Sequence, residues 1–487
     1  MSISCFIAGA DATDLQQTIS ELKSSGLVKE VFVVQPQNPG LHQVGWIEAA
    51  SFGSTRALEA IAAMAGEDLS LFYTKSMPLH LGQYALERMC RMAIDAQAVM
   101  LYADHYTLKN GNLQPHPTIE YQEGSLRDDF DFGSVVVYQT DALKKAVKSM
   151  DKTYAFAGLY DLRLRLSQTG KLVRMPEFLY TEAETDIRQS GQKMFDYVDP
   201  KNRDVQVEME QACSGHLKAV GAYLEPVFRS ISFDQEAFAV EASVIIPVRN
   251  REKTIADAIE SVLSQETAFD FNLIVVDNFS TDDTSNIIKS FAANDRRIIH
   301  LVPRRSDLGI GGCWNVGVAH PQCGKFAIQL DSDDLYIDRH VISRIVGAFY
   351  EQNCAMLVGS YQMVNFDLEE IPPGLIDHKE WTPNNGRNNA LRINGLGAPR
   401  AFYTPVLRDI KVPNTSYGED YALGLNISRE YQIGRIYEPL YLCRRWDENS
   451  DASLDIQKLN AHNFYKDKIR TLELWARRQY VKSGQKL

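Results

Sequence analysis

Between residues 243 and 331, short apolar segments rich in β-branched residues alternate with segments of helical periodicity. The apolar runs SVIIPV, NLIVV and FAIQL start at residues 243, 272 and 326, and such runs are typical of buried strands. Between the first two runs, the segment REKTIADAIESVLSQ places Ile255, Ile259 and Val262 on one helical face. Strands that alternate with helices predict a doubly wound, mostly parallel α/β sheet.

Carboxylates follow two of these predicted strands directly. Asp277 ends the second strand, and the third runs into Asp331 and Asp333. Ligands bind at the carboxyl ends of the strands in such sheets, so we expect these acids to face one crevice. Two carboxylates with one residue between them can hold Mg²⁺ or Mn²⁺ together with a substrate diphosphate. This acid-x-acid triplet is weak evidence for a metal site on its own, because 63 acids in 487 residues give about eight such triplets by chance. A helix N-cap with a solvated turn is the alternative.

Four motifs occur in order along this half of the chain. They are SVIIPVRNREKTIADAIESVLSQ, VVDNFSTDDT, DSDD and YGEDYALGLNI. With these motifs, residues 242–455 resemble the family 2 glycosyltransferases, which have the GT-A fold and invert the anomeric centre. The resemblance implies an enzyme that uses Mn²⁺ or Mg²⁺ to transfer a sugar from a nucleotide-diphospho-sugar to a hydroxyl of a glycan or lipid-linked acceptor.

The resemblance also implies roles for individual residues. Asp331 and Asp333 would hold the metal, and Asp420 would be the catalytic base. Asn278 stands where many relatives have a second aspartate, which leaves open the nucleobase that the donor carries. The residues implied for nucleotide-sugar binding are Pro247, Arg249, Asp277, Asn278, Asp331 and Glu419.

Two further segments are candidates for substrate contacts. Residues 372–399 are rich in Pro, Gly and Asn without clear periodicity, which in a segment of this length is often functional. By the same resemblance, the acceptor would meet Trp381, Asn384 and Arg392 there. The polar segment 444–453 is expected to fold over the donor, with Arg444 or Arg445 meeting a phosphate.

The first half of the chain repeats the second half weakly. LSLFYTKSMPLHLGQ lies over FAIQLDSDDLYIDRH, and LYDLRLRLSQTGKLVRMPEFLY lies over EDYALGLNISREYQIGRIYEPLY. The acids are lost in this copy: the alignment sets Gln35 opposite Asp277, Thr74 and Ser76 opposite Asp331 and Asp333, and Leu159 opposite Asp420. Without metal ligands, this copy is expected to be structural or to bind an acceptor or partner. Lys75, which lies between Thr74 and Ser76, leaves open a different phosphate anchor in place of the metal.

These observations predict an α/β fold of two tandem GT-A-like, Rossmann-related domains followed by a helix. Residues 1–235 would be a degenerate, non-catalytic domain, residues 240–455 the catalytic domain, and residues 456–487 a basic amphipathic C-terminal helix. That helix would dock with a solvated basic face, or would contact a membrane surface or a lipid-linked substrate.

Composition limits the remaining possibilities. A net charge of −12 argues against a nucleic-acid binder, and no apolar run reaches the roughly 18 residues of a membrane-spanning helix. The N-terminus resembles no secretory signal, and the seven cysteines are scattered, as in reduced cytoplasmic proteins. We therefore expect a cytoplasmic protein, with possible peripheral attachment to the inner face of the membrane.

Two other functions stay open. A sugar-phosphate nucleotidyltransferase also uses carboxylate-held Mg²⁺, but it would need a glycine-rich basic loop after the first strand, and PVRNREKT has no glycine. A non-catalytic scaffold in polysaccharide assembly is disfavoured for the second half by its acids. It remains possible for the first half.

Overall fold

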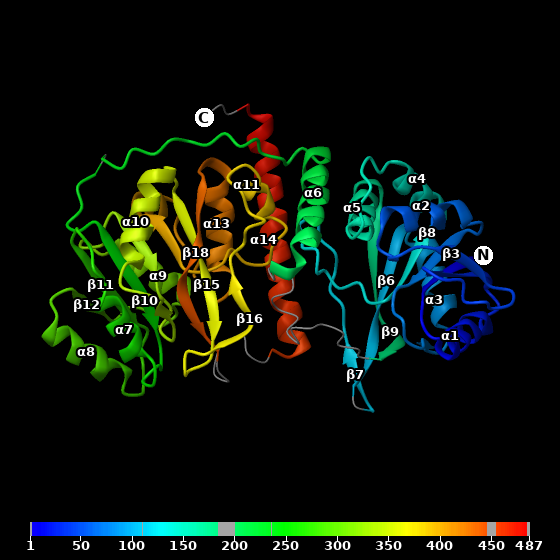
Figure 1. Ribbon diagram of the computed structural model, residues 1–487, viewed down its shortest axis with the longest axis horizontal. Helices are drawn as coiled ribbons and strands as arrows, with labels where there is room; N and C mark the ends of the chain where they lie inside the picture. The colour runs from blue at the N-terminus through cyan, green and yellow to red at the C-terminus, as the bar shows by residue number, and fades with distance from the viewer. Residues whose placement is uncertain (1, 110, 184–199, 235, 446–453, 485–487) are drawn as a thin grey trace. The chain divides into compact units, whose positions relative to one another are not determined.

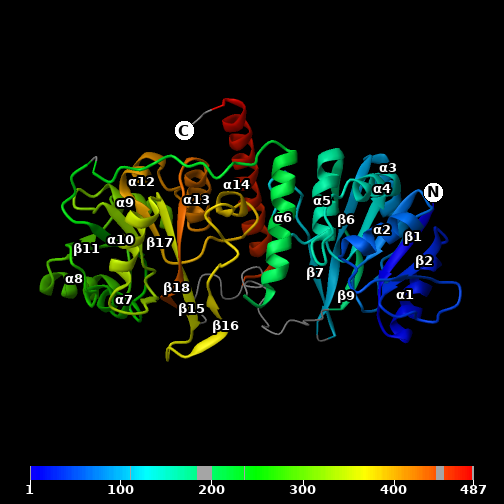
Figure 2. The same cartoon turned by 45° about the horizontal axis from the view of Figure 1, so that its top comes forward.

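The computed structural model describes residues 2–109, 111–183, 200–234, 236–445 and 454–484. They form two compact units, each a mixed α/β structure around one sheet (Figures 1 and 2). The first unit contains the described residues up to 183, with 204–222 and 454–471. The second contains 200–203, 223–445 without residue 235, and 472–484. The units thus differ from the predicted domain segments mainly at residues 223–234 and along the last helix.

The first unit is built on a nine-stranded sheet in the order β3-β2-β1-β4-β8-β6-β9-β5, with β7 beside β6. Its strands are β1 (Ile3–Ala8), β2 (Val28–Gln35), β3 (Gly45–Glu48), β4 (Leu69–Tyr73), β5 (His80–Leu81), β6 (Ala98–Lys109), β7 (Asn112–His116), β8 (Val135–Gln139) and β9 (Lys171–Ala183). Its helices are α1 (Ala12–Ser24), α2 (Thr55–Met64), α3 (Ala85–Asp95), α4 (Thr140–Lys148), α5 (Gly158–Thr169) and α6 (Arg203–Ala219).

Alternation along the strands divides the apolar residues of this unit between two layers. Cys5 lies in one core cluster with residues of α1 and α3, whereas Phe6 lies in the other with residues of α2, α4 and α5. Because neighbouring side chains on a strand point to opposite faces, continuous apolar runs need helices on both sides. The unit is therefore a three-layer α/β/α structure.

The second unit has a sheet of the same design, in the order β12-β11-β10-β13-β17-β15-β18-β14, with β16 beside β15. Its strands are β10 (Ala242–Val248), β11 (Phe271–Asp277), β12 (Ile298–Leu301), β13 (Phe326–Gln329), β14 (Leu335–Tyr336), β15 (Met356–Val364), β16 (Glu370–Ile376), β17 (Arg400–Tyr403) and β18 (Ile433–Arg444). Its helices are α7 (Ile255–Leu263), α8 (Thr284–Asn294), α9 (Ile310–Ala319), α10 (Val341–Gln352), α11 (Gly386–Asn389), α12 (Thr404–Ile410) and α13 (Glu419–Glu430).

The two sheets correspond strand for strand, with β1 equivalent to β10, β4 to β13 and β8 to β17. Their registers agree as well: Cys5 pairs with Val31 and Leu71, as Val244 pairs with Leu273 and Ile328. In both sheets the first four strands are parallel, the fifth strand (β8 or β17) is antiparallel to both of its neighbours, and the pair beyond it (β6–β9 or β15–β18) is parallel again. The predicted fold of two tandem GT-A-like domains is confirmed.

The predicted C-terminal helix is also confirmed as α14 (Ile456–Lys482). Its basic face is smaller than the sequence indicates, because Arg470 and Arg477 are fully buried. Each pairs at 2.8 Å with an acid one turn earlier, Asp467 and Glu473 respectively. Among the described helices, none is long and apolar enough to cross a membrane.

Glycines allow close packing at the start of α9, a helix that lies against β10 and β11. A Cβ atom on Gly311 would collide with the backbone oxygen of Pro413, whereas a Cβ atom on Gly347 in α10 would meet nothing within 4 Å. A side chain at residue 311 would therefore force the chain around Pro413 to move.

We predict that Gly311→Ala destabilises the protein by about 1–3 kcal/mol through this collision. The matched control, Gly347→Ala, lies on an exposed helical position and should stabilise it by about 0.5–1 kcal/mol. Urea denaturation measures both. Equal effects of the two substitutions would contradict the packing described.

Candidate active site

Asp277 ends β11 at the carboxyl edge of the second sheet and is almost fully buried. One carboxylate oxygen accepts a hydrogen bond from the Ser280 amide at 3.0 Å, and the other accepts one from the Ser285 hydroxyl. His300 Nε2 lies 3.4 Å from the second oxygen. Burial raises the pKa of Asp277, but the bonds from Ser285 and Ser280 outweigh burial and hold the pKa below its usual value. The carboxylate is therefore ionised and fixed in place.

The other residues predicted for nucleotide binding lie around the same edge. Pro247 on β10 pairs with Val276, directly before Asp277, and Arg249 follows the strand as an exposed residue. The Asn278 side chain donates from Nδ2 to the Leu308 carbonyl at 2.8 Å. Its Oδ1 atom is buried and accepts no hydrogen bond from the described residues. Such an oxygen is a vacant acceptor.

Asp331 and Asp333 follow β13, the neighbour of β10 on the other side. Two hydrogen bonds orient Asp331. Gln329 Nε2 donates to the Asp331 Oδ1 atom at 2.9 Å, and the backbone amide of Asp331 donates to the Tyr441 hydroxyl at 2.9 Å. The Asp333 carboxylate is 14% exposed, and its Oδ2 lies 3.9 Å from Arg251 Nε. The two acids thus stand at the same sheet edge as Asp277.

The third aspartate of this motif, Asp334, has a structural role. Its Oδ1 accepts a hydrogen bond from the Arg444 amide at 2.8 Å. Burial, followed by repulsion from Asp333 and Asp331, raises its pKa well above the usual value. Burial also raises the pKa of Asp331, with repulsion from Asp333, against the attraction of Arg400. Negative charge is therefore crowded in this turn.

The expectation that Arg444 meets a phosphate is not supported by its environment. Its side chain is buried, donates from Nε to the Asp333 carbonyl, and pairs through Nη1 with Asp257 Oδ2 at 2.8 Å. It also covers the ring of Phe366 at 4.7 Å. Arg444 thus positions the turn that carries Asp333. Residues 446–453 of the predicted covering segment lie outside the described residues.

Glu419 and Asp420 occupy the first turn of α13, which lies against β18 (Figure 2). The Glu419 carboxylate is buried, and its Oε2 atom has no hydrogen-bond partner among the described residues. Burial, then repulsion from Asp420, raises the pKa of Glu419 to about 7. The Asp420 carboxylate is 25% exposed and pairs with Arg400 Nη1 at 2.8 Å.

Arg400, which the sequence did not single out, connects the two carboxylate groups. Burial lowers its pKa, but the attraction of Asp420, Asp331 and Glu419 outweighs burial and raises it. Its backbone amide donates to Gln329 Oε1 at 3.1 Å, and the same Gln329 side chain holds Asp331. Asp331 and Asp420 are therefore positioned by one residue of β17.

The first unit shows the same positions without this chemistry. Gln35 ends β2 as Asp277 ends β11. By the pairing of β8 with β4 and of β17 with β13, Val136 stands where the second unit has Arg400. The arginine has thus been replaced in the same copy that lacks the acids.

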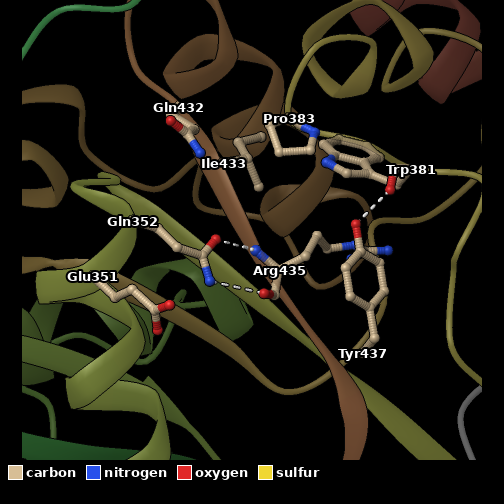
Figure 3. Close-up of a pocket in the computed structure, with 8 residues that line it drawn as sticks. All are labelled: Glu351, Gln352, Trp381, Pro383, Gln432, Ile433, Arg435 and Tyr437. Carbon is tan, nitrogen blue, oxygen red and sulfur yellow. Dashed lines mark hydrogen bonds between the residues drawn. The ribbon is translucent and has the colours of Figure 1, made fainter.

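The segment predicted to meet the acceptor is mostly covered. Trp381 and Arg392 are buried, and Asn384 is exposed. Trp381 lines a pocket of 250 Å³ with Pro383, the end of α10 and the start of β18 (Figure 3). Ile433, the first residue of β18, pairs with Met356 at the start of β15, whereas Arg435 pairs with Val358, which is also the partner of Arg400.

The comparisons with known proteins agree with the sequence motifs. Residues 243–407 match the family described as "Glycosyl transferase family 2". The putative glycosyltransferase EpsE of Bacillus subtilis is 32% identical over 44% of this chain and 74% of its own length. The enzyme WfgD of Escherichia coli, named as a UDP-Glc:alpha-D-GlcNAc-diphosphoundecaprenol beta-1,3-glucosyltransferase, is 32% identical over 40% of this chain and 72% of its own length. The chain therefore belongs to glycosyltransferase family 2.

Other similarities cover smaller shares of the matched proteins. An uncharacterized glycosyltransferase of Rickettsia felis is 30% identical over 41% of this chain, which spans about a third (32%) of that protein's length. The structure of S. aureus TarS residues 1–349 with UDP is 21% identical, covers 48% of this chain and 65% of its own, and has a TM-score of 0.37.

We predict that Glu419→Gln changes how stability depends on pH. The folded-state pKa of about 7 lies above the ordinary value of 4.5, so the folded chain binds more protons than the unfolded chain between these values. The free energy of unfolding should therefore fall by up to about 3 kcal/mol as the pH rises through this window. The Glu419→Gln variant should not show this decrease. Urea denaturation of metal-free protein at pH 5 and pH 8 measures it. The exposed Glu438→Gln is the control, and an unchanged pH dependence in Glu419→Gln would contradict the prediction.

Proposed function

We propose that the second unit transfers a sugar from a nucleotide-diphospho-sugar to a hydroxyl of a glycan or lipid-linked acceptor, with inversion of the anomeric centre. Family membership supports the reaction class. The observation that carries the proposal is the arrangement of Asp331 and Asp420 around Arg400 at one sheet edge. A donor diphosphate and a general base need to lie on opposite sides of one reacting carbon, and this arrangement brings their candidate residues together.

In this proposal, the nucleotide lies beside β10 and β11. Pro247 and Arg249 would line its pocket, and Asp277 and Asn278 would bind the base and ribose. The carboxylate of Asp277 is held ready to accept hydrogen bonds from ligand N–H or O–H groups. The vacant Oδ1 of Asn278 offers a further acceptor nearby.

Asp331 and Asp333 fit a divalent cation by their chemistry. Carboxylate oxygens suit Mg²⁺ or Mn²⁺, and the crowding that raises the pKa of Asp331 would be relieved by a cation. When bound, such an ion offsets the negative charge of a diphosphate leaving group. Gln329, Tyr441 and Arg444 hold the turn from which the two carboxylates project.

Asp420 is the proposed general base. It would accept the proton of the acceptor hydroxyl while that oxygen forms a bond to the anomeric carbon and the bond to the diphosphate breaks on the opposite side. Arg400 holds the Asp420 carboxylate at 2.8 Å and so sets its direction. Glu419, with its raised pKa, stands beside it and would line the donor pocket.

The acceptor is proposed from the relatives. The name of the E. coli relative contains a diphosphoundecaprenol acceptor, and that of a Bacillus spizizenii relative contains a poly(ribitol-phosphate) acceptor. A lipid-linked acceptor would bring the chain to the cytoplasmic face of a membrane. Leu472 and Trp475 of α14, each about half exposed, are the residues that we propose for peripheral contact there.

The first unit is proposed to be non-catalytic. Its sheet offers Gln35, Thr74 and Ser76 at the positions of the nucleotide and metal carboxylates, and it offers Val136 at the position of Arg400. None of these four side chains carries a charge. A metal would find no carboxylate ligand at these positions, and Lys75, the cation between Thr74 and Ser76, pairs with Glu182 at 2.5 Å.

We predict that Asp420→Asn lowers kcat by about 10²–10⁴-fold, because the amide cannot accept the proton, while donor binding stays within about threefold. Release of nucleoside diphosphate from UDP-, GDP- and TDP-sugars, with oligosaccharide and lipid-linked acceptors, measures the rate. Asp409→Asn, an exposed acid of α12, is the control. Wild-type turnover in Asp420→Asn, or a product that keeps the anomeric configuration of the donor, would contradict the proposal.

A further inference from the structure

Phe279, which follows β11 by two residues, has an unusual backbone conformation. Its φ angle is 58°, in the left-handed region that a bulky side chain rarely adopts. The turn is tight, because the Phe279 amide donates to the Asp277 carbonyl at 3.0 Å and the Ser280 amide donates to the Asp277 carboxylate. Glycine adopts this conformation without a steric cost. The geometry of the turn therefore does not explain a phenylalanine here.

Packing within the unit does not explain this residue either. The Phe279 side chain is 41% exposed, so much of its apolar surface lies in solvent. A left-handed bulky residue and exposed aromatic surface are both unfavourable, and such strain is found where a residue contacts a ligand. In the first unit, Gln37 takes the corresponding place two residues after β2, and its φ angle is not positive. The unusual turn thus occurs in the unit that has the acids.

Two loops at the carboxyl ends of β10 and β11, which lie side by side (Figure 1), hold Phe279 next to Arg249. The amide that precedes Phe279 donates to the Val248 carbonyl at 2.8 Å. The Asn250 amide donates to the Ser280 Oγ atom at 3.0 Å. Arg249 and Phe279 lie between these two bonds, one on each loop, and both side chains are exposed. A ligand at this edge can therefore reach both side chains.

The chemistry of these side chains limits the kind of ligand. A guanidinium group and an aromatic ring are both flat, and both stack on the face of a planar ring. The carboxylate of Asp277, in the same turn, only accepts hydrogen bonds, so it favours a ligand with N–H groups. A nucleobase has both features, a flat face and N–H groups on its edge. A phosphate or an aliphatic chain has neither.

We propose that Phe279 is a nucleobase-binding residue whose ring packs against the face of the donor's base. This role rests on the proposed function for its nucleotide, and it adds a contact that discriminates a nucleotide from the bare diphosphate. The proposal predicts two opposite effects of Phe279→Gly. The chain should become more stable, because glycine adopts the left-handed turn freely, and nucleotide binding should become weaker. A residue with only a structural role would not separate these effects.

Calorimetric titration of the full chain with UDP, GDP and TDP in the presence of Mn²⁺ tests the proposal. Phe279→Gly should weaken the binding of the nucleotide that the wild type binds by at least about fivefold. Pyrophosphate with Mn²⁺, which lacks a base, should bind to this variant within about twofold of the wild type. Phe279→Tyr keeps the flat ring and should bind the nucleotide as the wild type does. Urea denaturation should show a higher midpoint for Phe279→Gly.

Leu368→Gly is the matched control on the same unit. Leu368 lies in the turn between β15 and β16, has a φ angle of 62° and is 47% exposed. Its replacement removes a similar strain and a similar exposed apolar side chain. The urea midpoint should rise as it does for Phe279→Gly, and nucleotide binding should stay as in the wild type.

The outcomes separate this role from the proposed reaction. If wild type and Phe279→Gly bind the nucleotide equally, or if Phe279→Gly loses nucleotide and pyrophosphate binding to the same extent, the role of Phe279 is overturned and the transfer reaction is unaffected. Absence of nucleotide binding by folded wild-type protein would overturn the proposed reaction, and this role with it.

Discussion

The crowding of carboxylates at one sheet edge is the constraint on which the second unit depends. Asp420 and Asp331 both add to the burial that raises the pKa of Glu419, and Arg400 is the cation that attracts all three carboxylates. Such an arrangement is costly in an empty site, since burial and like charge both oppose ionisation. In the proposed reaction, a cation and a proton-bearing substrate would relieve this cost. The surrounding bonds from Gln329, Tyr441 and Arg444 then serve to keep that arrangement in place.

The first unit has the same sheet without the crowded carboxylates. They share strand order and register, so the sheet itself requires no carboxylates. In the first unit, valine replaces Arg400 at position 136, and uncharged residues replace the acids. An arginine with no carboxylates to hold would be a buried charge without a partner, which is strongly destabilising. A sheet of this design without the acids therefore favours an uncharged residue at the position of Arg400.

Local patterns in the sequence were sufficient for much of the fold and for the acids. Apolar runs that end in Asp277 and Asp331 predict both a strand and a crevice, because both depend on neighbours in the chain. Arg400 was missed because its partners come from β13 and α13, and only the folded sheet joins them. Arg444 or Arg445 was expected at a phosphate, and the structural role of Arg444 was missed for the same reason, since its partner Asp257 is distant in sequence. The buried ion pairs of Arg470 and Arg477 could likewise not be predicted from the basic composition of the last helix.

The central claim is that the carboxylates of the second unit hold a metal–diphosphate and that their counterparts in the first unit do not. Calorimetric titration of UDP, GDP and TDP, with and without Mn²⁺, tests it on wild type, Asp333→Ala and Ser76→Ala. We predict manganese-dependent binding of at least one nucleotide, lost in Asp333→Ala and kept in Ser76→Ala, the equivalent position of the first unit. Binding that survives Asp333→Ala, or no binding by folded wild-type protein under any condition, would contradict it.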